Sequence, residues 1–261
     1  QVLSFDLASG NQGAYSGTFG DNCRAAIPSP SGAFLAVFWS DSAGNSLSVV
    51  NLSTGQIVYS DSGINAEVGV WAKDSSSLAY FYGSGETASL KIVDTSWGSP
   101  ETLAGIFSSS THASPDQFTI NGIDSDSLGN FYVSLTTREP SGYSFDFYRF
   151  LIKVDSAALL THQVQIAYGA TPIVNEANSE VICYGQRPHS LFSLANLAPT
   201  GTPPAFSDVS IRRIRVSKDG AELTMAALSS EPYNLRLSAA DYSSLTAFPV
   251  VGFYRDMLRS E

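Results

Sequence analysis

A short acidic segment near the middle of the chain has the residue types of a site for a hard cation. Asp124 and Asp126 place two carboxylates at alternate positions before Gly129. Calcium prefers such groups of oxygen ligands, although the segment lacks the further acidic positions of an EF-hand loop. Asp124 and Asp126 are therefore candidate calcium ligands. The other interpretation is an ordinary turn, in which the aspartates accept hydrogen bonds from nearby backbone N–H groups.

Other candidate catalytic groups are scattered along the chain. Glu67 and Asp116 are candidates for the two carboxyl groups of a glycosidase, which must converge on one sugar bond. Nothing in their spacing brings them together. Gly83-Ser84-Gly85 is expected to be a hairpin turn rather than a nucleophile loop. The chain has three histidines, His112, His162 and His189. We predict no catalytic residue and, calcium apart, no cofactor.

An insertion rich in aromatic residues is the best candidate for recognition. Long ordered insertions on rigid scaffolds often carry binding functions, and Tyr, Phe and Arg are common anchors of interfaces. The predicted binding residues are Arg138, Tyr143, Phe145, Phe147 and Tyr148. The alternative is a longer hairpin that packs its own aromatic side chains.

The composition excludes several partners. The 261 residues include 14 basic and 24 acidic residues, which give a net charge of −10. A phosphate backbone needs a surface lined by Lys and Arg, so we expect no nucleic acid. The longest apolar run, Ala33 to Trp39, is too short to span a bilayer, so we expect no membrane insertion.

The two cysteines and the first residue leave alternatives open. Cys23 and Cys183 are either two thiols or one disulfide, because two cysteines are too few for a disulfide framework. The chain begins at Gln1 without a signal-like segment, so we expect a processed product or an excerpt.

These candidate residues must be positioned by a repeated pattern of strands. An apolar, β-branched strand that ends in Asp or Asn, followed by a small-residue turn, recurs roughly every 41–45 residues, with one interval of about 61 at the insertion. The terminal residues are Asp6, Asn51, Asp94, Asp155, Asn196 and Asp241. Asp and Asn stabilise such turns through side-chain to backbone hydrogen bonds.

A second phrase precedes the first in each complete unit. It is a polar turn followed by a nearly continuous apolar strand, as in Ser29–Gly32 before Ala33–Phe38. A strand of this kind is expected where both of its faces are buried between packed sheets.

Four strands per unit of this length predict an all-β fold, a β-propeller of four-stranded blades in a single domain over residues 1–255. The expected parts are a partial blade at 1–20, complete blades at 22–62, 63–107, 117–168, 170–208 and 209–255, and a tail at 256–261. We expect a ring of five to seven blades, and three options are open. The chain is an excerpt of a six- or seven-bladed ring, a second chain or domain completes the ring, or the N-terminal strands pack on a five-bladed ring. Two stacked sandwich domains are the alternative fold.

The repeat phrases resemble those of a known group of propellers. Ser29–Val37 followed by Ser46–Gln56, and also Ser217–Leu223, look like the YVTN and TolB-like, WD-repeat-like propeller repeat. Asp124–Val133 is more similar to the related NHL or gluconolactonase-type phrase. The resemblance implies the propeller fold, but it leaves the function open, since propellers host enzymes, receptors and scaffolds alike.

We therefore expect a propeller that binds a protein or glycan partner rather than one that catalyses a reaction. Its low charge and its content of Ser, Thr and Gly suit an extracellular, periplasmic or virion-surface protein. The alternative is a lactonase-like or glycan-processing hydrolase with its site in the central funnel. The resemblance implies that such a hydrolase holds its metal from several blades, and the candidate residues facing the channel are Glu67, Asn121, Asn175 and Arg213.

Overall fold

The chain folds into antiparallel sheets, which confirms the all-β prediction. The structure, a computed structural model, describes residues 2–5, 12–15, 22–82, 89–104, 117–141, 144–167, 170–185, 189–201, 210–217, 219–228 and 233–249. These residues contain no α-helix, and they contain no helix long and apolar enough to cross a membrane.

Five four-stranded sheets follow a two-stranded one, as expected for five blades after a partial blade. The partial blade is β1 (Val2–Phe5) and β2 (Gln12–Tyr15). Blade 1 is β3 (Asn22–Pro28), β4 (Phe34–Asp41), β5 (Gly44–Asn51) and β6 (Ile57–Ser62). Blade 2 is β7 (Ile64–Trp71), β8 (Ser77–Tyr82), β9 (Ser89–Asp94) and β10 (Glu101–Leu103).

The remaining blades have the same order of strands. Blade 3 is β11 (Gln117–Ser125), β12 (Phe131–Ser141), β13 (Ser144–Val154) and β14 (Leu160–Gln165). Blade 4 is β15 (Ala170–Asn175), the 3₁₀ turn η2 (Glu176–Asn178), β16 (Glu180–Gly185), β17 (Ser190–Ser193) and β18 (Pro199–Gly201). Blade 5 is β19 (Ser210–Val216), β20 (Glu222–Leu228), β21 (Tyr233–Ser238) and β22 (Ser244–Pro249).

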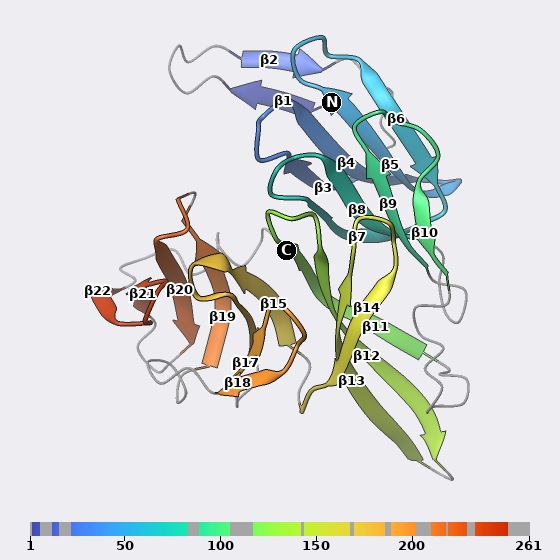
Figure 1. Cartoon of the computed structure of the whole chain (residues 1–261). Coiled ribbons are helices and arrows are strands. Elements are labelled where there is room, and N and C mark those ends of the chain that lie inside the picture. Colours follow the sequence, from blue (N-terminus) through green and yellow to red (C-terminus); the bar gives the residue numbers. More distant parts are fainter. Residues whose placement is uncertain are drawn as a thin grey trace.

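The first strand of each blade lies at the centre of the arrangement. In every blade the strands pair in chain order, and β3, β7, β11 and β15 each contact the first strand of the next blade. The sheets follow one another around an arc that has the two-stranded sheet at one end and blade 5 at the other (Figure 1). The first strands therefore form the hub, and the fourth strands form the rim.

The second strands of blades 1 to 4 are buried on both faces over most of their length. Each lies between two neighbours in its own sheet, and its sheet is covered on both sides. Ala36, Val37 and Phe38 of β4 are all buried, and so are the residues of β8 from Leu78 to Phe81. This explains why these segments are apolar without alternation.

The polar turn between the first and second strands has the same conformation in all five blades. Gly32, Gly129 and Gly220 adopt positive φ there, and each donates its N–H to the carbonyl three residues earlier. Ser75 and Ser179 occupy the same left-handed position in the other two blades. Glycine is favoured at this position because a residue with a Cβ is strained at positive φ.

The turns after the third strands contain the hydrogen bonds that the repeat predicts. In blade 1, Oδ1 of Asn51 accepts the N–H of Ser53 at 2.9 Å. The same bond recurs in the four following blades at Asp94, Asp155, Asn196 and Asp241. The local sequence therefore determines where each of these turns lies.

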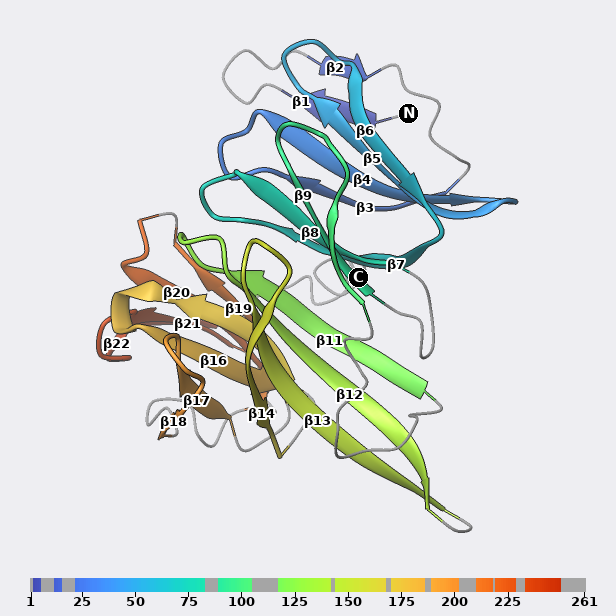
Figure 2. The ribbon, with the colours of Figure 1, turned by 45° about the vertical axis from the view of Figure 1, so that its right-hand side comes forward.

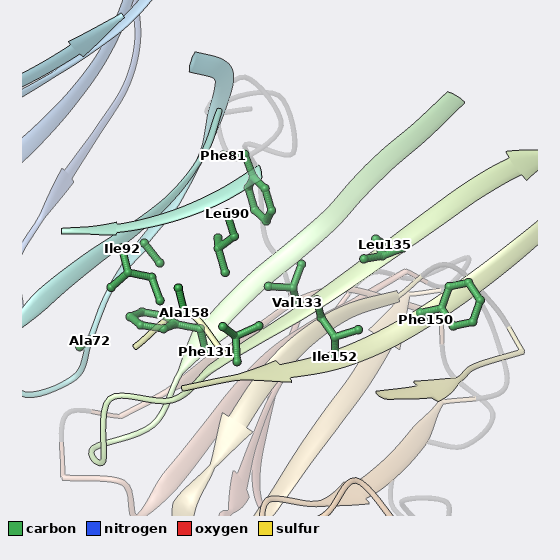
Figure 3. Close-up of a cluster of buried hydrophobic side chains, with 12 residues drawn as sticks. Ala72, Phe81, Leu90, Ile92, Phe131, Val133, Leu135, Phe150, Ile152 and Ala158 are labelled. Carbon is green, nitrogen blue, oxygen red and sulfur yellow. The ribbon is translucent and has the colours of Figure 1, made fainter. Parts of the chain in front are cut away.

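The hydrophobic core is divided into layers, each lying between two adjacent blades. Phe131, Val133 and Ile152 of blade 3 pack with Leu90 and Ile92 of blade 2 in one layer (Figure 3). Similar layers join blade 1 to blade 2, blade 3 to blade 4 and blade 4 to blade 5. Each sheet therefore buries its faces only because its neighbours are present.

Candidate functional site

The hairpin formed by β12 and β13 is the most distinctive feature of the molecule. Each of the two strands has 11 residues, whereas the second strands of the other blades have 6 to 8. The pairing is continuous from Phe131 opposite Val154 to Ser141 opposite Ser144. The hairpin consequently projects beyond the other sheets (Figure 2). The predicted insertion is thus a regular extension of a blade rather than an irregular loop.

One face of the projecting hairpin is anchored to the core. Tyr148 packs against the cluster between blades 2 and 3, in which Leu135 and Phe150 are buried. Thr137, opposite Tyr148 in the register, is also buried and donates its hydroxyl to the Tyr148 carbonyl at 3.4 Å. Figure 3 shows Leu135 and Phe150 farther out along the hairpin than the rest of the cluster. The base of the hairpin is therefore held rigidly.

The other face of the hairpin is open to solvent at its outer end. Successive side chains of a strand point to opposite faces, so Phe147 lies on the opposite face from Tyr148 and on the same face as Leu151. Leu151 is buried in the cluster between blades 3 and 4, so this is the face that blade 3 turns toward blade 4. The Phe147 side chain is 53% exposed, although it is a large apolar group. Arg138 lies directly opposite it in the register and is half-buried.

The five predicted binding residues thus fall into different positions. Arg138 and Phe147 are together on one face, and Tyr148 lies on the opposite face, where it stabilises the hairpin. The backbone of Phe145 belongs to β13, but its side chain lies outside the described residues, as does the whole of Tyr143.

Asp126, a predicted calcium ligand, uses its carboxylate within its own turn. Its Oδ1 accepts the N–H groups of Leu128 at 3.0 Å and Asn130 at 2.8 Å. Its Oδ2 accepts the Asn130 amide at 2.8 Å and the Tyr132 hydroxyl at 3.0 Å. Both carboxylate oxygens therefore accept hydrogen bonds from protein donors. This arrangement favours the interpretation of the segment as an ordinary turn.

Asp124, the second predicted ligand, connects two blades at the hub. Its Oδ2 accepts the N–H of Val174 in β15 at 2.7 Å. Burial raises the pKa of the Asp124 carboxyl, although the Val174 N–H and nearby Lys73 act in the opposite direction. Lys73 reaches from blade 2 to donate to the Val174 carbonyl at 3.2 Å and lies 3.9 Å from Glu176. No group of three His, Cys, Asp or Glu side chains in the described part of the chain is arranged to hold a metal ion.

The other hub candidates do not form a common site. Asn175 does not line a channel: it is 0% exposed and donates its amide to the Ala239 carbonyl of blade 5 at 2.7 Å. The Asn121 amide donates within its own blade, to Thr136 Oγ1 at 3.0 Å. The side chain of Glu67 and the whole of Asp116 lie outside the described residues.

Blade 5 turns a polar face away from blade 4. Arg213 and Arg215 are exposed on β19, on the side opposite Ile214, which is buried against blade 4. On the same face, the Arg236 guanidinium donates Nε to Glu222 Oε2 at 3.0 Å. This face contrasts with the apolar faces between the other blades.

A polar network between blades 1 and 2 was not predicted. The three consecutive aromatic residues of β8 differ in their surroundings: Tyr80 packs toward blade 1, Phe81 packs toward blade 3, and Tyr82 is exposed at the end of the strand. The Tyr80 hydroxyl donates to Asp61 Oδ2 at 2.7 Å, and Lys91 donates to the same oxygen at 2.8 Å. Burial raises the pKa of Tyr80 far above its ordinary value. No local sequence signal joins Asp61 to Lys91.

The remaining thiols and imidazoles of the described residues belong to blades 1, 3 and 4. Both described cysteines are free thiols; Cys23 is exposed and Cys183 is buried. Burial raises the pKa of the Cys183 thiol to about 12. His189 is buried beside β17, His162 lies in the outer strand β14, and His112 lies outside the described residues.

Comparison with known proteins supports the fold. No known protein family has a sequence profile that matches this chain, and no curated protein matches it in sequence. Among solved structures, prolyl oligopeptidase B from Galerina marginata is similar at a TM-score of 0.61 and 14% identity, over 87% of this chain and 34% of that chain. The present chain thus spans about a third of that protein.

Two other solved structures match over most of this chain. The β-propeller domain of the Trilobed protease from Pyrococcus furiosus, described as having an open velcro topology, matches at a TM-score of 0.54 and 10% identity, over 96% of this chain and 74% of that chain. An oligogalacturonate lyase in complex with manganese matches at 0.57 and 15% identity, over 95% of this chain and 73% of that chain. At these identities the likeness shows a β-propeller and nothing about activity.

Proposed function

We propose that this propeller is a binding module that presents the outer end of the β12–β13 hairpin to a partner protein. The observation that carries the proposal is Phe147, a large aromatic side chain that is 53% exposed on a strand anchored at its base. Aromatic and Arg side chains dominate the energetics of protein interfaces. Arg138, opposite Phe147, supplies the second such side chain.

The rigidity of the hairpin supports this proposal. Thr137 is buried, and Tyr148 packs against the cluster between blades 2 and 3, so the base of the hairpin is already ordered before a partner binds. Binding by a preorganised surface loses less conformational entropy than binding by a mobile loop.

The alternative, a hydrolase in the central funnel, has less support. The carboxylates of Asp124 and Asp126 are already bonded to protein donors, and the amide of Asn175 joins two blades. The proposal includes a relationship to the YVTN and TolB-like propellers and an extracellular, periplasmic or virion-surface location. The composition, with only 15% charged residues, is the basis for that location.

The test is a deletion of the hairpin tip. Residues 138–147 are replaced by Asn-Gly, since the flanking pair Thr137 and Tyr148 suits a two-residue type I′ turn. A phage-displayed library of random peptides is panned on the whole chain and on the tip-deleted variant, and a glycan array is probed with both. We expect peptides that bind only the whole chain.

The control is the stability of the tip-deleted variant. Its melting temperature should stay within a few degrees of the parent, because the buried residues of the hairpin are retained. Peptides that bind both proteins equally would contradict the proposal, and tip-dependent binding of glycans alone would replace the protein partner with a glycan.

A further inference from the structure

The outer edge of β13 has backbone groups that point away from its own sheet. The Arg149 carbonyl accepts the N–H of Ile166 at 2.8 Å, and the Lys153 carbonyl accepts the Thr161 hydroxyl at 3.1 Å, both on the β14 side. In an antiparallel strand, alternate residues direct both N–H and C=O to the same side. The N–H and C=O of Phe145 and Phe147 therefore also point toward the β14 side.

β14 ends before it reaches this part of β13. Its last pair is Gln165 opposite Phe150, and the bond from Ile166 to Arg149 is the next one along. Within the described residues, no strand pairs with this edge of β13 from Ser144 to Tyr148. Among the described residues, no strand therefore pairs with the outward N–H and C=O groups of Phe145 and Phe147. An edge of this kind accepts another strand.

The opposite edge of the hairpin is blocked. Pro140 of β12 lies opposite Phe145. Because the backbone groups of Phe145 point away from β12, the backbone nitrogen of Pro140 points away from β13, toward the outer edge of β12. Proline has no N–H, so the β12 edge lacks a donor where the β13 edge has one. Proline is a common device for protecting an edge strand, and here it protects only one of the two edges.

We infer that the β13 edge from Ser144 to Tyr148 is a strand-addition site for an extended segment of the partner protein. This inference rests on the proposed function and specifies its mode of binding. The main chain of Phe145 and Phe147 forms hydrogen bonds with the added strand, as in other cases of β-augmentation.

The side chains of β13 define the composition of that segment. The residue placed beside Phe147 shares its face, and an apolar side chain there covers the exposed ring. The neighbouring residue lies on the other face beside Asp146, which is exposed, and a basic side chain there forms an opposite-charge pair. A net charge of −10 also attracts a basic segment. The partner segment therefore alternates apolar and basic residues.

A second copy of this chain is a poorer occupant. The free edge is only a few residues long, and a stable protein interface buries about 1,200 Å² or more. Two copies that each carry a net charge of −10 also repel one another. A peptide segment satisfies the same backbone groups without either difficulty.

Two substitutions at one position separate backbone pairing from side-chain recognition. Phe147→Ala removes the ring and keeps the outward N–H, whereas Phe147→Pro removes both and obstructs the edge. The probes are the tip-dependent peptides from the panning experiment, and their affinities are measured by fluorescence anisotropy. We expect Phe147→Pro to bind at least about tenfold more weakly than Phe147→Ala, and we expect the selected peptides to alternate apolar and basic residues.

A second measurement uses the unaltered protein, so it does not depend on how the proline variant folds. Each peptide is N-methylated at one position at a time, and binding should be lost at alternate positions only. Equal affinities of the Pro and Ala variants, together with no alternation in the methylation scan, would overturn strand addition while leaving tip binding intact. Failure to select any tip-dependent peptide would instead overturn the proposed function. A dimer seen by light scattering and abolished by Phe147→Pro would assign the edge to a second copy.

Discussion

Replacing Asp126 with alanine tests whether the acidic turn of blade 3 is structural. Asp126 is 4% exposed, and its carboxylate accepts four hydrogen bonds from three residues, Leu128, Asn130 and Tyr132. Each donor left without an acceptor in a buried place costs about 1–3 kcal/mol. The Leu128 N–H can be rehydrated, because that residue is 83% exposed.

The Tyr132 hydroxyl also contributes less than a full penalty to the lost free energy of unfolding. The Tyr132 hydroxyl retains another acceptor, the Leu194 carbonyl of blade 4, at 3.1 Å. The two Asn130 donors then account for most of the change, so Asp126→Ala should lower the free energy of unfolding by about 3 kcal/mol. For a chain of this size, the melting temperature should fall by about 6–12 °C.

The assay is thermal unfolding by calorimetry, with calcium and with a chelator. The matched control is Asp74→Ala in the equivalent turn of blade 2, where Asp74 is exposed and its Oδ1 accepts the Ser76 N–H at 2.9 Å. We expect that control to lose under about 1 kcal/mol. A change for Asp126→Ala no larger than that of the control would refute the hydrogen-bond reasoning. A wild-type melting temperature that rises with calcium, and a variant that no longer responds, would establish the calcium interpretation instead.

Three other predictions concern packing, charge and thiol reactivity. Gly69→Ala should destabilise the chain by about 1–3 kcal/mol in denaturant unfolding, because an added Cβ would lie 2.6 Å from Phe38 Cζ of blade 1. The pKa of Asp124 is raised by burial, so its contribution to stability is greatest at low pH and is lost as the pH rises through its folded pKa; Asp124→Asn should gain stability relative to the parent as the pH rises from the acid range to neutrality. Iodoacetamide should label Cys23 alone in the native chain and also Cys183 after denaturation, as read by mass spectrometry, because Cys23 is exposed and burial raises the pKa of Cys183 to about 12.

Each of these has a result that would contradict it. Gly98→Ala is the control for Gly69, since its added Cβ would meet only Ser96 Oγ at 3.7 Å, and equal effects of the two would argue against the close approach between blades. A stability difference for Asp124→Asn that does not vary with pH would show that burial leaves the titration of this carboxyl unchanged. Rapid native labelling of Cys183 would show that blade 4 opens readily.

Much of the fold could be predicted from residues that are close together in the chain. The Asn51 turn and its counterparts are closed by hydrogen bonds between residues two apart, and the left-handed positions at Gly32 and Gly129 lie within single turns. An apolar strand follows each polar turn, so the number of four-stranded blades was readable before any tertiary information. These features are local because turn chemistry and strand periodicity act over a few residues.

The candidate site could be predicted only in part. The sequence alone located the insertion at Arg138–Tyr148, but the order of its side chains did not reveal which face of the hairpin would be buried. The tertiary structure decided this: Tyr148 packs against the hydrophobic cluster between blades 2 and 3, whereas Phe147 on the other face is exposed. The free edge of β13 likewise depends on where β14 ends in space.

The contacts between blades were the least predictable part. Asn175 binds the Ala239 carbonyl, Lys73 crosses from blade 2 to Val174, and Lys91 binds Asp61. The partners in these pairs are far apart in the chain, and their meeting depends on how each twisted sheet packs against the next. The sequence by itself therefore determined the blades and their turns, while the packing of one blade on another decided which polar groups are used up inside the protein and which remain free to bind.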